Sequence, residues 1–504
     1  MNPKMESKAF LESTPQHNWD SHNWSANDRA DRLYQGPFPT ELVPNWNVVM
    51  TTMPSDQPAP NYGMGLMAYV IGDLLPKRKN GESVRETIEK IAQIPMASKL
   101  YIRPTWRQMQ SQRGKLDLFE HWQVTMEMAV KYNKRVGFRI MLANPDIEEE
   151  SLPDFILENA PMFHLGTGWE EEGGVKGDDV RARREHHLPH YHHPYFLEAL
   201  EEFDALLAEK YNGHADIEFM DTYMYGFWGE GHSWPFDHIS PFPDHATALE
   251  TWIRIFEMQR AHWDKTPLVT NTQPDNNHVG NAEMLERTIH TGNWIRTDTI
   301  FIENQQIEAL SNRPAHIAAV CEVGMSDGTP ESLKLENGIP HTENIIAHVK
   351  DVGANYWSLW NWHNIHAEHV MNYYRQYPDG IDGLNRCIGY RIRPSWIWTY
   401  DHSNRSGLVV GLVNDGIAGV PGILRSTLLD ERNNILVSGT LDAGYPIPHK
   451  VRQVRLVLPA GVGWEGTRLK AELIVKGVIH PVRWACRESL NPDGSLTLKR
   501  NSNL

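Results

Sequence analysis

The chain has few cysteines, no long apolar run and a deficit of positive charge. Its three cysteines, Cys321, Cys387 and Cys486, are too scattered for a disulfide framework or a CxxC zinc site, which fits a reducing compartment. No segment approaches the roughly 18 consecutive apolar residues of a membrane-spanning helix, so we expect no membrane partner. The first residues lack the apolar core of a secretory signal. We therefore expect a cytoplasmic protein, or a periplasmic or secreted one from which a signal peptide has been removed.

The charge balance argues against a nucleic-acid partner. The 504 residues carry 48 Lys and Arg against 64 Asp and Glu, a net charge of −16. The densest basic stretch, residues 181–184, has acidic residues on both sides. A phosphate backbone would need clustered Lys and Arg. The sequence leaves the oligomeric state open, a homo-oligomer included.

Aromatic side chains are abundant. The chain has 18 Trp and 17 Tyr, and flat rings that carry a polar atom suit a site that stacks sugars. The alternative interpretation is that these rings pack a large core.

From residue 63 onward, short apolar runs alternate with amphipathic segments. This alternation is typical of parallel strands covered by helices, and the count of strands reaches eight. We therefore expect an α/β fold, a (β/α)₈ TIM barrel. The expected strands are Gly65–Ile71, Lys99–Arg103, Val136–Ala143, Ile217–Tyr225, Leu268–Thr270, Thr299–Ile302, Ile317–Glu322 and Tyr356–Trp360.

Three regions are expected along the chain. Residues 1–60 read as an N-terminal arm that packs on the barrel, and residues 61–384 as the catalytic barrel. Residues 385–504 lose helical periodicity and alternate in short strands between turns such as Asn414-Asp-Gly416, so we expect a C-terminal β-sandwich.

Glu230 is the strongest candidate for chemistry. It follows the fourth expected strand within Trp228-Gly-Glu-Gly-His232, where flanking glycines allow a tight turn. Active sites of such barrels lie at the carboxyl ends of the strands. Burial beside Trp228 and Trp234 would raise the pKa of Glu230, as a general acid requires.

Glu322 is the second candidate, because it ends the seventh apolar run. Arg103, at the end of the second expected strand, is its natural partner in either a structural salt bridge or an active site. A guanidinium would keep Glu322 ionised, as a nucleophile requires. One acidic and one nucleophilic carboxyl facing each other across a barrel mouth are the arrangement that breaks a glycosidic bond.

With these residues in place, the sequence resembles the clan A glycoside hydrolases, whose acid/base follows strand four and whose nucleophile follows strand seven. Trp228-Gly-Glu-Gly-His232 and the following sandwich resemble bacterial beta-galactosidase-like barrel proteins. The resemblance implies that Arg103 lies near the nucleophile and that Trp360, in the eighth strand, lies under the sugar ring. It departs at Gly229, where the clan usually has an Asn that binds the sugar; Asn144 or Asn271 would then replace that donor.

Other polar residues have open interpretations. Glu303, which follows the sixth expected strand, could replace Glu322 as nucleophile or bind a hydroxyl group. His232 and His363 are placed to bind hydroxyl groups. Asp221 is better explained as a buried structural carboxylate paired with Arg139.

Histidines gather in one loop, at residues 186–193. Their proline-broken spacing differs from metal sites held by a regular element, so we expect neither metal nor cofactor. The sequence thus predicts a retaining, exo-acting glycoside hydrolase for β-linked, galactose-containing carbohydrate. The alternatives are a non-catalytic carbohydrate-binding barrel and a metal-dependent lyase or isomerase that uses the His-rich loop.

Overall fold

The structure is a computed structural model of the whole chain. It describes residues 47–71, 81–167, 179–272, 279–297, 304–322, 324–325, 341–361, 366–402 and 405–500. The chain divides into two compact units. One comprises Gly65–Arg313 and Ala319–Leu384, and the other comprises Asn385 onward together with Pro314–Ala318 and the described residues before Gly65.

The first unit is a closed barrel of eight parallel strands. β2 pairs with β3 on one side and with β12 on the other, and the pairing of β10 with β12 closes the circle. The expected (β/α)₈ fold is therefore confirmed. The barrel strands are β2 (Gly65–Ile71), β3 (Lys99–Ile102), β4 (Arg135–Arg139), β7 (Ile217–Asp221), β8 (Leu268–Asn271), β9 (Trp294–Thr297), β10 (Ala319–Cys321) and β12 (Tyr356–Asn361).

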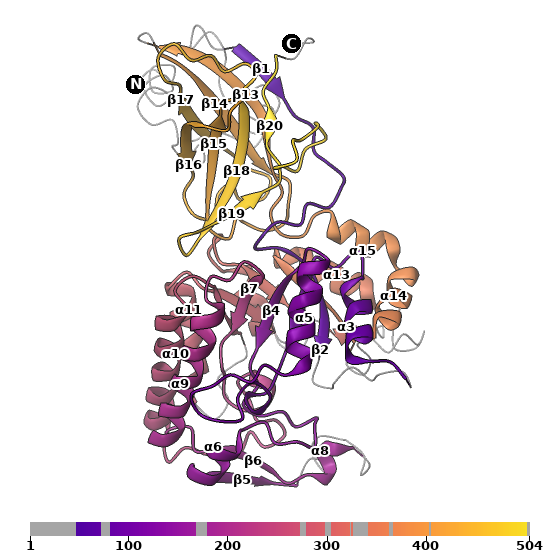
Figure 1. Cartoon of the computed structure of the whole chain (residues 1–504), viewed down its shortest axis with the longest axis vertical. Coiled ribbons are helices and arrows are strands. Elements are labelled where there is room, and N and C mark those ends of the chain that lie inside the picture. Colours follow the sequence, from indigo (N-terminus) through magenta and orange to yellow (C-terminus); the bar gives the residue numbers. More distant parts are fainter. Residues whose placement is uncertain are drawn as a thin grey trace. The chain divides into compact units, whose positions relative to one another are not determined.

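Helices follow most strands. Figure 1 shows α9, α10 and α11 side by side along the barrel, and the contacts of α10 with both neighbours agree. α10 begins after Asp244, whose side chain accepts a hydrogen bond from the Thr247 N–H and so caps the helix. The main helices are α3 (Val84–Ala92), α5 (Glu120–Lys131), α9 (Pro194–Tyr211), α10 (His245–His262), α11 (Asn281–His290), α12 (Asn304–Ser311), α13 (His341–Asp351), α14 (Ala367–Gln376) and α15 (Pro378–Asn385).

One strand differs from the expectation. The sixth barrel strand is β9, Trp294–Thr297, and the expected strand over 299–302 lies outside the described residues. Arg296 interrupts the apolar pattern of this short segment, which is why periodicity missed it. The long connection after β4 also contains an antiparallel hairpin that periodicity missed, formed by β5 (Met162–Gly166) and β6 (His186–Pro189).

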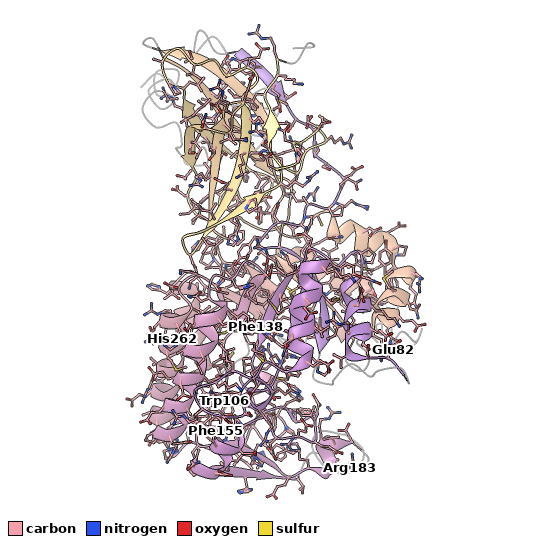
Figure 2. The ribbon with its side chains drawn as sticks, viewed as in Figure 1. Glu82, Trp106, Phe138, Phe155, Arg183 and His262 are labelled. Atoms are coloured by element: carbon pink, nitrogen blue, oxygen red, sulfur yellow. The ribbon has the colours of Figure 1, made fainter. Side chains whose placement is uncertain are left out.

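Tryptophans fill the core to a large extent. Among the described residues, nine tryptophan side chains are fully buried, so the packing interpretation accounts for half of the 18. Trp106 is an example: its ring centroid lies 6.1 Å from that of Phe155, and Figure 2 shows the two side chains close together. Trp106 also stacks on Phe203 of α9, with centroids 5.2 Å apart. These contacts anchor the long connection after β4 to the helix that follows it.

The second unit is a β-sandwich of two antiparallel sheets. The strand order in the first sheet is β1-β13-β14-β17, and the second has the order β16-β15-β18-β19 with β20 on β18. Within the expected arm, β1 pairs with β13. The strands are β1 (Asn47–Thr51), β13 (Ile392–His402), β14 (Arg405–Asn414), β15 (Ile423–Leu429), β16 (Ile435–Thr440), β17 (Val451–Val457), β18 (Arg468–Val475), β19 (Val478–Val482) and β20 (Leu496–Thr497).

Among the described residues, no helix is both long and apolar enough to cross a membrane.

Candidate active site

The two candidate carboxylates lie close together at the carboxyl ends of the strands. Arg103, directly after β3, has its Nη1 nitrogen 3.1 Å from Glu230 Oε1 and 3.7 Å from Glu322 Oε1. All three side chains are buried. The expected partnership of Arg103 with Glu322 is thus present, but Glu230 is the nearer partner.

The loop that carries Glu230 depends on its glycines. Gly229 and Gly231 have φ angles of 74° and 92°, which favour glycine, and a Cβ atom on Gly231 would lie 2.4 Å from Asn281 Nδ2. Trp228, which directly precedes Gly229, also has a left-handed backbone conformation, with a φ angle of 55°. Its carbonyl accepts a hydrogen bond of 2.7 Å from Arg139, and its indole N–H donates one of 2.6 Å to Asp146. These bonds hold the turn in the conformation that directs Glu230 to Arg103.

The environment of Glu230 contradicts the expected raised pKa. Burial raises the pKa, but the hydrogen bond of His232 and the charges of Arg139, Arg103 and His232 outweigh it and lower the pKa to about 2. Arg139 Nη1 lies 3.1 Å from Oε1, and His232 Nε2 lies 3.6 Å from Oε2. Glu230 is therefore ionised at neutral pH in the ligand-free site. The expected rise in pKa was wrong because Arg139, which was assigned to Asp221 alone, also contacts Glu230.

Besides Arg103, Glu322 has two partners that Glu230 does not contact. The Tyr69 hydroxyl, from β2, donates a hydrogen bond of 2.7 Å to Oε1, and Arg296, from β9, contacts Oε2. Sequence analysis missed both partners. Arg296 could have been found because it is a charged residue within the short apolar run of β9. A charged residue at the end of an apolar run is what identified Glu322.

Asp221, the last residue of β7, joins the same network. The predicted pair with Arg139 is confirmed, with Nε 3.1 Å from Oδ2. Arg296 Nη1 lies 2.8 Å from that oxygen, and the Tyr101 hydroxyl also donates to it. Burial raises the pKa of Asp221, although Arg139 and Tyr101 oppose the shift. Each of the three arginines thus contacts two carboxylates.

The two candidate asparagines have different positions. Asn271 is the last residue of β8. Its Nδ2 donates a hydrogen bond of 3.3 Å to the Glu230 carbonyl, so Asn271 lies beside the loop that carries Glu230. Asn144 is buried, and its Oδ1 accepts a hydrogen bond from the Asp146 N–H at 3.0 Å, which stabilises the turn after β4. The ring centroids of Trp228 and His232 are 5.7 Å apart.

Three candidates cannot be placed. Glu303 and His363 lie outside the described residues. Trp360 belongs to β12, where its backbone is paired with Gly324, but its side chain is outside the described part of the chain.

The His-rich loop does not converge on one point. His186 bonds to the Arg181 carbonyl, His187 Nε2 lies 3.1 Å from Glu150, and His190 bonds to the Pro241 carbonyl. Within the described residues, no group of three or more His, Cys, Asp or Glu side chains could hold a metal ion.

The separation of the two carboxylates is bounded by Arg103. Because one nitrogen lies 3.1 and 3.7 Å from the two Oε1 atoms, those atoms are no farther apart than the sum of these distances. This bound excludes a separation beyond about 10 Å, and it includes the retaining distance of about 5–5.5 Å and the shortest inverting distances, near 6.5 Å.

Comparisons with known proteins show no close relative. No protein-family model matches the chain, and no curated protein matches it. Among solved structures, the lactosyl-enzyme intermediate of endo-glycoceramidase II from Rhodococcus sp. is 12% identical, with a TM-score of 0.35, over 82% of this chain and 100% of that chain.

Two further solved structures show a similar level of likeness. The beta-galactosidase of Marinomonas ef1 is 13% identical, with a TM-score of 0.35, over 59% of this chain and 54% of that chain. The catalytic domain of beta-amylase from Paenibacillus polymyxa is 9% identical, with a TM-score of 0.39, over 62% of this chain and 97% of that chain. At such scores the likenesses carry no argument about activity, and the fold assignment rests on the strand pairing.

Proposed function

We propose that this chain is a glycoside hydrolase that cleaves β-linked, galactose-containing carbohydrate with retention of configuration. The observation that carries the proposal is the pair Glu230 and Glu322, two buried carboxylates after different barrel strands that share one nitrogen of Arg103. Hydrolysis of a glycosidic bond requires two carboxyl groups at such a distance.

Glu322 is the nucleophile in this proposal. Its oxygen attacks the anomeric carbon while Glu230 protonates the leaving oxygen, so the glycosidic bond breaks as the glycosyl-enzyme ester forms. Glu230 then takes a proton from water, and the resulting hydroxide replaces Glu322 at the anomeric carbon. Tyr69 and Arg296 orient Glu322 and stabilise its charge when it leaves.

The first step needs a proton on Glu230, which the ligand-free site holds ionised. Substrate binding must therefore weaken the pairing of Glu230 with Arg103, Arg139 or His232 and so raise its pKa. The sequence-based assignments complete the proposed subsite: His232, Asn271 and Asn144 bind hydroxyl groups, as do Glu303 and His363, and Trp228 and Trp360 provide apolar faces.

A panel of nitrophenyl β-glycosides, galactoside included, tests this proposal. We expect release of nitrophenol by the wild-type protein and loss of turnover by at least about 10³-fold in Glu322→Gln. Circular dichroism would verify that the variant is folded. Full activity in that variant would exclude Glu322 as the nucleophile and would leave Glu303 to be tested.

A carbohydrate-binding barrel without catalysis is the second candidate. The observation that favours it is the pairing of both carboxylates with guanidinium groups, which holds Glu230 ionised where a general acid would carry a proton. Binding of glycans to the wild-type protein without any hydrolysis of the panel would support this candidate against the first.

A further inference from the structure

The charges around Glu230 balance only when every carboxylate is ionised. The described residues bring together three guanidinium groups, Arg103, Arg139 and Arg296, and three carboxylates, Asp221, Glu230 and Glu322. Their side chains are at most 7% exposed. Water therefore does little to screen a mismatch of charge in this cluster.

The other titratable groups that face the cluster do not balance the charge left by a proton on Glu230. Burial raises the pKa values of Tyr69 and Tyr101 well above their usual range, so both hydroxyls are neutral. Burial also raises the pKa of Asp146, which bonds to Trp228, to about 6, and above that pH its charge is balanced by Arg181, 3.6 Å away. His232 is neutral or cationic. When Glu230 takes the proton that catalysis requires, the six-residue cluster is left with one excess positive charge, which is costly in a buried site.

Two buried nitrogen atoms of the arginines lack a partner. Arg139 Nη2 and Arg296 Nε have no hydrogen-bond acceptor within the part of the chain that the structure describes. Arginine presents its N–H groups in a planar fork that matches carboxylate, phosphate and sulfate oxygens. The cluster thus has hydrogen-bond donors without acceptors. It also has one excess positive charge when Glu230 carries the proton that catalysis requires.

We propose that the sugar unit bound beside Glu230 carries an acidic group, a uronic carboxylate or a sulfate, whose oxygen atoms pair with Arg139 and its neighbouring arginines. This inference rests on the proposed function and narrows its substrate class. The anion replaces Glu230 as counter-ion, so Glu230 can take up a proton while the cluster stays neutral. A neutral sugar provides no such replacement.

Proton uptake on binding is the direct consequence. In the ligand-free protein Glu230 is ionised well below neutral pH, because its pKa is about 2. With an anion beside Glu230, the positive charges of the arginines no longer outweigh the effect of burial, and the pKa of Glu230 rises. Binding of an acidic sugar near pH 5 should therefore consume about one proton per site, whereas a neutral sugar should consume none.

Isothermal titration calorimetry in two buffers of different ionisation enthalpy measures this uptake. The probes are galacturonate, a galactose sulfate and galactose, each titrated into the full-length wild-type chain. We expect the acidic probes to bind at least about ten-fold more tightly than galactose. We also expect the uptake to vanish in Glu230→Gln, which cannot titrate. The galacturonate and sulfate arms show which anion the site takes.

Arg139→Lys provides a second test, because it keeps the positive charge but replaces the forked guanidinium, Nη2 included, by a single nitrogen. We expect its affinity for the acidic probe to fall about ten-fold more than its affinity for galactose, because loss of the Trp228 and Glu230 contacts affects both probes alike. As a matched control, Arg287→Lys changes a half-buried arginine on α11 that pairs with Glu257 and should affect neither probe. Should Arg139→Lys fail to fold, proton uptake by the wild-type protein still decides the matter.

The outcomes separate this inference from the proposed function. Equal affinity for galactose and the acidic probes, without proton uptake, would overturn the acidic-sugar inference. Rapid hydrolysis of neutral β-galactosides together with that result would leave the hydrolase proposal intact. Tight binding of the acidic probes with proton uptake, but no hydrolysis of any acidic glycoside, would keep the acidic site and reject the hydrolase.

Discussion

The two ends of the barrel contain buried ion pairs of different design. At the amino-terminal end, Lys99 Nζ lies 2.9 Å from Glu218 Oε1, and the Tyr356 hydroxyl donates to the same oxygen at 2.6 Å. One lysine thus neutralises one carboxylate, with Arg135 farther away at 3.9 Å. At the carboxyl-terminal end, each of three arginines is shared between two carboxylates.

The two clusters differ in whether their protonation can change during a reaction. Burial raises the pKa of Glu218, but the charges of Lys99 and Arg135 outweigh it and lower the pKa, so this pair stays ionised. The shared arginines of the other end can exchange one carboxylate partner for another anion. In barrels of this fold, the carboxyl-terminal end holds the active site and the other end serves stability. Variants at each end test that division.

Removal of the proposed acid should have the largest effect. In Glu230→Ala, hydrolysis of substrates with poor leaving groups should fall by about 10²–10⁴-fold, because no group protonates the leaving oxygen. Activated nitrophenyl substrates should lose less. Azide should restore turnover and yield a β-glycosyl azide, detectable by mass spectrometry. An equal loss for all leaving groups, without rescue, would remove Glu230 from the acid/base role.

Glu218→Gln at the opposite end should change stability rather than chemistry. It leaves Lys99 buried without its counter-ion, which costs about 3–5 kcal/mol. Urea unfolding measures the loss, and turnover per folded molecule should stay unchanged. Glu257→Gln is the control, because its exposed pairs with Arg260 and Arg287 contribute less than about 1 kcal/mol. A stable but inactive Glu218→Gln protein would contradict the division between the two ends.

Acid should weaken the fold through Glu230. Its pKa in the folded chain, about 2, lies below the value near 4.3 of an unfolded chain. The stabilisation is therefore complete above about pH 5 and is lost as the pH falls toward 2, by on the order of 3 kcal/mol. Urea unfolding across this range should show a smaller decline in Glu230→Gln than in the wild-type protein. An identical decline would mean that Glu230 is not paired as described.

Arg296→Lys should have the smallest effect of the four. A lysine keeps the charge but cannot contact Asp221 and Glu322 with two nitrogens, so we expect kcat to fall about ten-fold with KM little changed. Arg135→Lys, the equivalent change at the other end, should leave kcat unchanged. Equal kcat values in the two variants would show that Arg296 does not position Glu322.

Local patterns predict most of the fold. The bounds of β2 match the expectation residue for residue, because an uninterrupted apolar run marks them. The sequence pattern did not predict β9, because Arg296 occupies a strand position where hydrophobic periodicity requires an apolar residue. The polar side chain is explained only by partners from two other strands, which no local pattern contains.

The same reason limits the prediction of the site. Glu230 and Glu322 stand out locally, one between glycines and the other after an apolar run. The ionisation of Glu230, by contrast, depends on Arg103 and Arg139, which come from two other strands and meet it only in the closed barrel. Local sequence identifies the reactive groups, whereas their charge state follows from the assembled fold.

Trapping of the covalent intermediate would show which carboxylate attacks the sugar. An activated β-galactoside or β-galacturonide with fluorine in place of the hydroxyl next to the anomeric carbon would be incubated with the protein, and its peptides analysed by mass spectrometry. With Glu322 as the nucleophile, we expect one added fluoro-sugar on the peptide that contains Glu322. A label on Glu230 or Glu303 instead would contradict the assignment of the nucleophile, and turnover of the parent glycoside with inverted product would contradict the retaining mechanism.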